Sequence, residues 1–291
     1  MPERDGYIPG VPCWIDTSQP DPEAAVAFYR GLFGWDLEDV MPPGSPGKYF
    51  MAQLGGRDVA GVGSPPEGAP PVAVWNTYIW VQSADATAAK VTEAGGRTLA
   101  APFEVMEAGR MATFADPEGA VFSVWQARQH KGARLVNEAG SLSFNGLHTR
   151  DVEAAKTFYG AVFGWRTLRI GGAEFWTLPG YGDHLEERDP GLRQRASEFG
   201  AAGFEDVVAS INPIGAEERQ MPAHWSVTFA IDDADAIGER ATALGGKVLT
   251  PPFDAPWSRT IVIADPQGAS FVANKFVPEN RSVGGATDRA A

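Results

Sequence analysis

Histidine and cysteine are the first side chains to consider for acid-base or metal chemistry, and this chain has four histidines and one cysteine. Three of the histidines lie outside the expected strands: His130, His184 and His224. His148 ends an expected strand, where its imidazole could act as a base or donate a hydrogen bond to a ligand. The alternative is an imidazole held by a structural hydrogen bond. Cys13 has no second cysteine for an internal disulfide, so we expect a small buried side chain.

Two arginines occupy matching places in the sequence. Arg110 and Arg259 each precede a copy of the phrase "ADPxGA". A guanidinium can pair with a carboxylate or donate to a carbonyl, so either residue could contact a ligand. Pairing with an acidic residue of the protein itself is the alternative. Both arginines are therefore candidate ligand-binding residues.

The sequence segments expected to position these residues occur twice in the chain. The phrase "DPEAAVAFYRGLFGW" (21–35) returns as "DVEAAKTFYGAVFGW" (151–165), and "AGGRTLAAPFE" (94–104) returns as "LGGKVLTPPFD" (244–254). "ADPEGAVFSVW" (115–125) returns in the same order as "ADPQGASFVAN" (264–274). The repeats predict two homologous domains, at 9–128 and 141–277, joined by a linker at 129–140. An insertion at about 179–204 is expected to be a lid or a solvated loop, and 278–291 a disordered tail.

Local signals place a helix and a hairpin turn in each repeat. Asp21 can cap the first helix, Pro22 suits its first position, and Gly34 can end it in a left-handed conformation. Aromatic residues then fall at helical spacing and are expected to pack in the core: Phe28, Tyr29, Phe33 and Trp35, with Phe158, Tyr159, Phe163 and Trp165 in the second repeat. "DPEG" and "DPQG" have the residue preferences of a type I turn between strands.

Composition excludes several classes of function. Lys and Arg total 24 against 37 Asp and Glu, and the net charge of −13 would repel a nucleic acid backbone. The sequence contains no apolar run near the length of a membrane span, and its start lacks the pattern of a secretory signal. We therefore expect a cytoplasmic protein with neither a nucleic acid nor a membrane as its partner.

In combination, "FYxxxFGW", "GGxxLxxPF" and "DPxGAxF" resemble the vicinal oxygen chelate superfamily, which includes glyoxalases, bleomycin-resistance proteins and dioxygenases. The resemblance covers roughly residues 9–277. It implies an α+β fold, a tandem repeat of two domains in which paired βαβββ modules form a curved, cup-like sheet with helices outside. The sequence also resembles two-domain actinobacterial members that are associated with antibiotic biosynthesis and resistance.

Metal-dependent enzymes of this superfamily place histidine or carboxylate ligands at four positions of each cup. Alignment through the repeat phrases puts those positions on Trp14, approximately Gly61, Asn76 and Ser123 in the first repeat, and on Phe144, approximately Ala209, Ser226 and Val272 in the second. None of these side chains is a histidine or a carboxylate, so they would hold a divalent metal weakly. We therefore expect neither a bound metal nor another cofactor.

Side chains two apart on a strand share a face, and this rule extends each aligned position into a cup lining. Seven candidates line the first cup: Trp14, Asp16, Asn76, Tyr78, Trp80, Ser123 and Trp125. Four line the second: Phe144, His148, Ser226 and Thr228. Aromatic rings with a few polar groups suit a planar ligand, although rings that merely fill the barrel are the alternative.

The first hypothesis is a metal-independent protein that binds a hydrophobic, polycyclic aromatic natural product, for antibiotic sequestration or as an accessory in antibiotic biosynthesis. The second is a glyoxalase-like enzyme, of the lyase, isomerase or hydroxylase/dioxygenase type, with Asp16, Tyr78 or His148 as the acid or base. The third is a partner protein that assists an oxygenase. A homodimer remains open.

Overall fold

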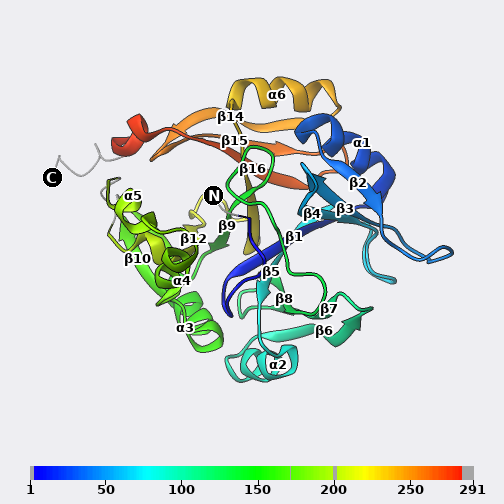
Figure 1. Cartoon of the computed structure of the whole chain (residues 1–291), viewed down its shortest axis with the longest axis horizontal. Coiled ribbons are helices and arrows are strands. Elements are labelled where there is room, and N and C mark those ends of the chain that lie inside the picture. Colours follow the sequence, from blue (N-terminus) through cyan, green and yellow to red (C-terminus); the bar gives the residue numbers. More distant parts are fainter. Residues whose placement is uncertain (1–2, 171, 199–201, 284–291) are drawn as a thin grey trace. The chain divides into compact units, whose positions relative to one another are not determined.

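The computed structural model describes residues 3–170, 172–198 and 202–283 (Figure 1). Over these residues each sequence repeat forms one eight-stranded mixed sheet. The strands of the first sheet are β1 (Pro12–Ser18), β2 (Asp36–Asp39), β3 (Tyr49–Leu54), β4 (Arg57–Gly63), β5 (Val74–Trp80), β6 (Arg97–Val105), β7 (Gly109–Ala115) and β8 (Val121–Ala127). Those of the second are β9 (Leu142–Thr149), β10 (Arg166–Ile170), β11 (Ala173–Thr177), β12 (Val207–Pro213), β13 (His224–Ala230), β14 (Lys247–Ala255), β15 (Ser258–Ala264) and β16 (Ser270–Phe276).

The two sheets have the same topology. The first runs in the order β2, β3, β4, β1, β5, β8, β7, β6, and the second runs β10, β11, β12, β9, β13, β16, β15, β14. In the first sheet β1 is parallel to β4 and β5 is parallel to β8, while the outer neighbours are antiparallel. Each half sheet is therefore a βαβββ module, and the predicted α+β tandem fold is confirmed.

Six α-helices and two 3-10 helices lie in the described part of the chain. The α-helices are α1 (Pro22–Phe33), α2 (Ala84–Glu93), α3 (Val152–Phe163), α4 (Tyr181–Arg188), α5 (Leu192–Glu198) and α6 (Ala234–Ala243). The 3-10 helices are η1 (Phe204–Asp206) and η2 (Pro278–Ser282). Of the helices in these residues, none combines the length and the hydropathy that a membrane crossing requires.

The predicted signals at the ends of α1 are confirmed. The Asp21 side chain accepts a hydrogen bond from the amide of Ala24, and Gly34 ends the helix with a φ of 73°. A residue without a Cβ adopts this left-handed conformation at little cost. Asp151 and Gly164 repeat both features at the ends of α3.

The two predicted hairpin turns are also confirmed. Asp116 begins the turn between β7 and β8, and its Oδ1 accepts hydrogen bonds from the amides of residues 118, 119 and 120. Asp265 begins the turn between β15 and β16, and its Oδ1 accepts from the amides of residues 267 and 269. In each "DPxG" phrase, one side-chain oxygen of the aspartate therefore stabilises the turn by accepting hydrogen bonds from backbone amides.

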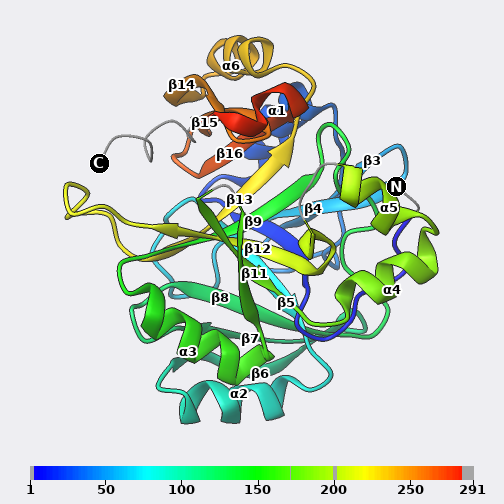
Figure 2. The same cartoon turned by 90° about the vertical axis from the view of Figure 1, so that its left-hand side faces the viewer.

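Two compact units divide the chain differently from the sheets. Unit 1 contains Met1–Cys13, Thr77–Gly132 and Phe144–Trp225, and unit 2 contains Trp14–Asn76, Ala133–Ser143 and Ser226–Ala291. In unit 2, α1 contacts α6, which packs on β14 and β15 (Figure 1). In unit 1, α2 contacts α3 and packs on β6 and β7 (Figure 2). The predicted domain limits follow the sheets, whereas each compact unit takes segments from both repeats.

The repeated "FYxxxFGW" phrase packs in the core of each unit, as predicted. In unit 2, Phe28, Tyr29 and Trp35 are buried, and Phe33 is half-buried. The Tyr29 hydroxyl donates to Asp265 Oδ2 at 2.9 Å and accepts from the indole nitrogen of Trp75 at 3.1 Å. The tyrosine of the first repeat thus binds the turn aspartate of the second.

Unit 1 contains the reciprocal cluster. The Tyr159 hydroxyl donates to Asp116 Oδ2 at 3.1 Å and accepts from the indole nitrogen of Trp225 at 2.9 Å. Burial raises the pKa of both Tyr159 and its counterpart Tyr29 well above the usual range, so both phenols stay protonated near neutral pH.

Two expectations about irregular segments require correction. Residues 179–198 of the insertion are mainly helical, because they contain α4 and α5; residues 199–201 lie outside the described part. The prediction of disorder from residue 278 is wrong for Pro278–Ser282, which form η2. There the Asn280 side chain donates to Asp254 Oδ1 at 3.1 Å and to the Ser258 carbonyl at 3.0 Å. Residues 284–291 lie outside the described residues.

Candidate functional site

A hydrogen-bonded group of side chains in unit 2 surrounds Asp16. We call it the Asp16 network and define it as Trp14, Asp16, Ser18, Tyr49 and Asn76. The Tyr49 hydroxyl donates to Asp16 Oδ2 at 3.2 Å and accepts from the Trp14 indole nitrogen at 3.0 Å. The Asn76 amide nitrogen donates to Asp16 Oδ1 at 2.9 Å and to Ser18 Oγ at 3.2 Å. Strand alternation and the alignment of repeats placed Trp14, Asp16 and Asn76 in one cup lining. Asn76 contacts Asp16 directly, and Trp14 is joined to Asp16 through the Tyr49 hydroxyl.

Tyr49 is the member that sequence reasoning missed. It begins β3, and its side chain reaches across β4, where Gly61 and Gly63 lie on the same face. A Cβ added at Gly61 would lie 2.2 Å from the Tyr49 hydroxyl oxygen, and one at Gly63 would lie 2.8 Å from the ring. These glycines therefore leave the space that the tyrosine ring occupies. Two glycines spaced two apart in "AGVG" are the sequence signal that could have indicated a large neighbour.

The Tyr49 hydroxyl is held in its protonated form. Burial raises the pKa of this phenol well above its usual range, and the negative charge of Asp16 raises it further. Trp14 and Asp16 are buried, while Tyr49, Asn76 and Ser18 are half-buried. The network therefore joins two aromatic rings, a carboxylate and an amide on partly accessible strand faces.

The other candidates of the first repeat lie in unit 1. Tyr78 pairs with Ser123 across the parallel strands β5 and β8, and the Ser123 hydroxyl lies 2.9 Å from that of Thr113. The Trp125 indole nitrogen donates to the carbonyl of His130 at 2.9 Å. The Trp80 ring contacts Tyr7, with centroids 6.1 Å apart. That these residues share one cup with the Asp16 network remains a prediction.

Both candidate arginines are paired with carboxylates of their own unit. Arg110 forms ion pairs with Asp85 at 2.8 Å and with Glu104 at 3.1 Å. Arg259 binds Asp235 at 3.0 Å and Asp254 at 3.3 Å. These contacts match the alternative of pairing within the protein, and contact with a ligand remains a prediction for both side chains.

In the second repeat, His148 stacks on another histidine. Its ring centroid lies 4.4 Å from that of His224, which begins β13 and was not expected within a strand, and the planes differ by 7°. Burial lowers the pKa of His148 to about 4, with a further contribution from His224, so His148 is neutral near pH 7. His224 Nδ1 lies 2.9 Å from the Pro222 carbonyl. A neutral His148 could accept a proton but is a weak base.

The remaining candidates of the second repeat divide between the units. Phe144 lies in unit 1, where its ring contacts Phe175 with centroids 6.2 Å apart. Ser226 and Thr228 lie in unit 2 and are half-buried, and Thr228 pairs with Val272 between β13 and β16.

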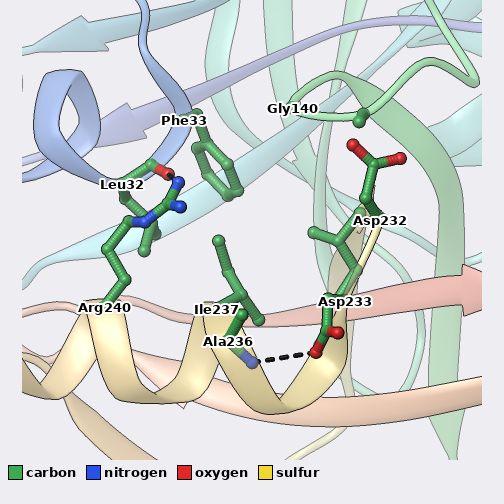
Figure 3. A pocket seen from close by; sticks show the side chains of 10 residues that line it. Leu32, Phe33, Gly140, Asp232, Asp233, Ala236, Ile237 and Arg240 are labelled. Carbon is green, nitrogen blue, oxygen red and sulfur yellow. Dashed lines mark hydrogen bonds between the residues drawn. The ribbon is translucent and has the colours of Figure 1, made fainter.

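A separate pocket of about 270 Å³ lies in unit 2 at the ends of α1 and α6 (Figure 3). Its polar side chains serve the helix ends: Asp233 Oδ1 accepts from the Ala236 amide at 2.9 Å, and Arg240 Nη1 donates to the Leu32 carbonyl at 3.1 Å. Asp233 and Arg240 are thus engaged at the helix ends, and Asp232 also lines the pocket.

The donor set at the family's metal positions does not fit a divalent metal. In the first repeat, the Trp14 indole nitrogen is a donor, Gly61 has no side chain, and Asn76 and Ser123 are hydrogen-bonded within the protein. In the second repeat the aligned residues are Phe144, Ala209, Ser226 and Val272. Among the described residues, no group of three or more histidine, cysteine, aspartate or glutamate side chains could hold a metal ion.

The chain matches one protein family and is similar to several named proteins. The profile of the Glyoxalase/Bleomycin resistance protein/Dioxygenase superfamily matches residues 14–124 and 142–272. CFP32 of Mycobacterium tuberculosis, a provisionally named glyoxylase, is 38% identical over 297 residues, covering 96% of this chain and all of that protein. The anthracycline biosynthesis protein DnrV of Streptomyces peucetius is 34% identical over 280 residues, covering 91% of this chain and 93% of that protein.

A solved structure supports the fold alone. The Mn(II)-bound glyoxalase from Novosphingobium aromaticivorans superposes with a TM-score of 0.58 at 16% identity, covering 92% of this chain and 83% of the other. At that identity, the metal of the glyoxalase carries no implication for the residues of this chain.

Proposed function

Since the chain belongs to the glyoxalase/bleomycin resistance/dioxygenase superfamily, we propose that its first repeat binds a hydrophobic, polycyclic aromatic small molecule without a metal ion. The Asp16 network is the part of the site that carries this proposal. Its rings give flat contact area, and its polar groups can orient a ligand. The role would be sequestration of an antibiotic or an accessory step in its biosynthesis.

The observation that supports metal-independent binding is the glycine at position 61. Where the superfamily alignment expects a metal ligand on β4, this chain has a glycine whose space is taken by the Tyr49 side chain. The Tyr49 hydroxyl is in turn bonded to Trp14 and Asp16. The Tyr49 hydroxyl therefore lies next to Gly61, the aligned position at which metal-dependent members have a histidine or carboxylate ligand.

The relatives support the class of ligand. DnrV is named for anthracycline biosynthesis, and DauV of a Streptomyces strain, also 34% identical over 280 residues, carries the same description. Anthracyclines are flat, fused-ring compounds with hydroxyl groups. Such a compound matches an aromatic surface that also contains a carboxylate, a phenol and an amide.

Calorimetric titration with a panel of anthracycline aglycones tests the proposal. We expect saturable binding that is unchanged after treatment with EDTA. Replacing Trp14 with alanine should weaken binding about tenfold, because an aromatic contact is lost. Trp257→Phe is the matched control, since Trp257 lies between β14 and β15 of the second repeat, where it stacks on Phe276. Its affinity should equal that of the unaltered protein.

Two outcomes would contradict the proposal. One is no saturable binding across the panel by a protein whose circular dichroism and urea midpoint are normal. The other is binding that EDTA abolishes and that one equivalent of Mn²⁺, Fe²⁺, Ni²⁺ or Zn²⁺ restores.

A glyoxalase-like enzyme is the second candidate, favoured by the name of CFP32 and by the contact of the Asp16 carboxylate with the Tyr49 phenol. The raised pKa keeps the Tyr49 phenol protonated, so it could donate a hydrogen bond to a substrate but is a weak acid. Mass spectrometry of the bound compound after prolonged incubation separates the candidates. An unchanged ligand supports binding, and a product formed by the protein but not by Asp16→Asn supports catalysis.

A further inference from the structure

The pocket at the ends of α1 and α6 is a cavity that the proposed function does not use. We call it the α1–α6 pocket; it is lined by Leu32 and Phe33 of α1, by residues 139–140, and by six residues between 231 and 240 (Figure 3). We propose that this pocket binds a small dipolar compound, with an ammonium group at one end of an apolar body and a carboxylate at the other. Its lining shares no residue with the Asp16 network, so this site is independent of the proposed function.

The apolar walls of the pocket are held in place by the core of unit 2. Leu32 and Ile237 are buried, and Phe33 is half-buried. The ring centroid of Phe33 lies 4.8 Å from that of Phe229, which belongs to the core. A volume of about 270 Å³ is below the range of roughly 300–1,000 Å³ that is typical of pockets for drug-sized ligands. The walls therefore favour a ligand with a short apolar body.

The negative side of the pocket is formed by Asp232. Its side chain is exposed, and Figure 3 shows its carboxylate on the same side of the pocket as Gly140. Within residues 3–170, 172–198 and 202–283, this carboxylate has no hydrogen-bonding or ionic partner. The carbonyl oxygen of Phe33 is a second acceptor there, since a Cβ added at Gly140 would lie 3.3 Å from it. This carbonyl ends α1, where the helix dipole attracts a cation, so an ammonium group can bind on this side.

The positive side of the pocket is formed by Arg240 of α6. Its Nη1 donates to the Leu32 carbonyl at 3.1 Å, and this bond holds the side chain beside the last turn of α1 (Figure 3). A guanidinium has five N–H donors, and this bond uses one of them. Arg240 forms no ion pair with a carboxylate in the described part of the chain. It can therefore bind a ligand carboxylate through two parallel hydrogen bonds.

A dipolar ligand pairs with both sides of the pocket at once. Asp232 and Arg240 lie on opposite sides in Figure 3, with the side chain of Ile237 between them. A simple amine would also meet the positive charge of Arg240, and a simple acid would also meet the negative charge of Asp232. Asp233 favours the amine of these two, because hydrogen bonds from two backbone amides of α6 lower its pKa and keep it charged. We therefore expect affinity to fall from dipolar ligand to amine to acid.

Titrations of the protein at pH 7, followed by NMR of its backbone amides, test this ranking. The dipolar probes are 4-aminobutanoate, 6-aminohexanoate and 8-aminooctanoate, and the singly charged controls are hexylamine and hexanoate. We expect saturable shifts of the Gly140, Ala236 and Ile237 amides with the dipolar probe whose length matches the pocket. That probe should bind about two- to fivefold more tightly than hexylamine, because an exposed ion pair makes a modest contribution. Hexanoate should bind most weakly.

Two variants separate the two ends of the ligand. Asp232→Asn should weaken binding of the best dipolar probe and of hexylamine about two- to fivefold, because the partner of the ammonium group is lost. Arg240→Gln should weaken the dipolar probe by a similar factor and strengthen hexylamine. Asp36→Asn and Lys247→Gln are the matched controls, because they make the same charge changes at exposed residues of unit 2 outside the pocket. Both controls should keep the affinities of the unaltered protein.

Three results would overturn the α1–α6 pocket as a dipolar site. One is the absence of saturable shifts at these amides with every dipolar probe. Another is binding of hexylamine or hexanoate that is as tight as that of the best dipolar probe. The third is unaltered affinity in Asp232→Asn, which is informative even if Arg240→Gln is unstable, because the Asp232 side chain has no partner to lose among the described residues. All three leave the aromatic binding proposed for the Asp16 network standing, since the anthracycline aglycones test that separately.

Discussion

At the scale of single residues, Gly61 and Tyr49 form a matched pair. The register of β3 and β4 puts Tyr49 opposite Gly63 and Met51 opposite Gly61, so the tyrosine ring covers both glycines. The fit is close enough that a single methyl group at residue 61 would overlap the phenol. The pair therefore sets the position of the hydroxyl that Asp16 and Trp14 share.

Coupling between these two residues can be measured by a double-mutant cycle. Gly61→Ala should destabilise the protein by about 1–3 kcal/mol, the usual cost of overpacking a tight site. In a Tyr49→Ala background the same substitution should cost clearly less, because the nearest remaining neighbour of the methyl group is then the Asp16 Cβ at 3.0 Å. Urea unfolding of the four proteins gives the coupling energy. Equal costs in both backgrounds would show that Tyr49 does not occupy this space in solution.

Sequence reasoning found most members of the Asp16 network but not its centre. Trp14 and Asn76 follow from the alignment of repeats, and Asp16 follows from Trp14 by the two-residue period of a strand. Tyr49 could not be found this way. Its place depends on how β3 pairs with β4, and that register is fixed by long-range contacts rather than by local pattern.

At the scale of elements, the helix phrase and the turn phrase depend on each other. Tyr29 on α1 donates to Asp265, which the Gln19 side chain also contacts at 2.6 Å. Tyr159 on α3 donates to Asp116 Oδ2, and no second side-chain donor to that oxygen is recorded among the described residues. The two clusters are therefore similar but unequally supported.

This inequality predicts a ranking of two variants. Tyr29→Phe and Tyr159→Phe each leave a buried indole N–H and an aspartate oxygen short of a partner, and each should lower the free energy of unfolding by about 1–3 kcal/mol. Tyr159→Phe should cost more, because Asp265 keeps the bond from Gln19 while Asp116 Oδ2 loses its donor. Urea unfolding midpoints of Tyr29→Phe and Tyr159→Phe, measured against the unaltered protein, show which variant is less stable. The reverse order would contradict the assigned hydrogen bonds.

Local elements were the most predictable part of the fold. The cap at Asp21, the helix end at Gly34 and the turns at Asp116 and Asp265 all depend on neighbours in sequence, so local preference suffices. The partner of each turn aspartate did not follow. Tyr29 and Asp265 are separated by 236 positions, and nothing in either phrase indicates the other. The helical content of the insertion was also missed, since Pro, Gly and mixed charge gave no clear period.

At the scale of the whole molecule, the two repeats share their cores. Each sheet belongs to one repeat, but α1 contacts α6 in unit 2 and α2 contacts α3 in unit 1. A chain ending after the first repeat keeps its sheet and loses the partners of both helices. The free energy gained by burying those helix faces would then be lost.

Expression of residues 1–128 alone tests this dependence. We expect the fragment to aggregate or self-associate, because it lacks α6 and α3, and apolar side chains of α1 and α2 would then be exposed. Co-expression with residues 129–291 should give a soluble one-to-one complex. Size-exclusion chromatography and thermal unfolding provide the readout. A monomeric fragment that unfolds cooperatively would show that each repeat folds independently.

The exchanged tyrosine–aspartate bonds have a consequence for how such a duplicated protein can diverge. The helix tyrosine of each repeat is hydrogen-bonded to the turn aspartate of the other repeat. A substitution of either residue in one repeat therefore removes a hydrogen bond from a residue of the other repeat. The residues around Asp16 take no part in these bonds, and there the copies already differ: Asp16 against Gly146, Asn76 against Ser226. One copy can thus acquire a new specificity, by natural change or by redesign, while the mutual dependence of the two copies preserves the scaffold.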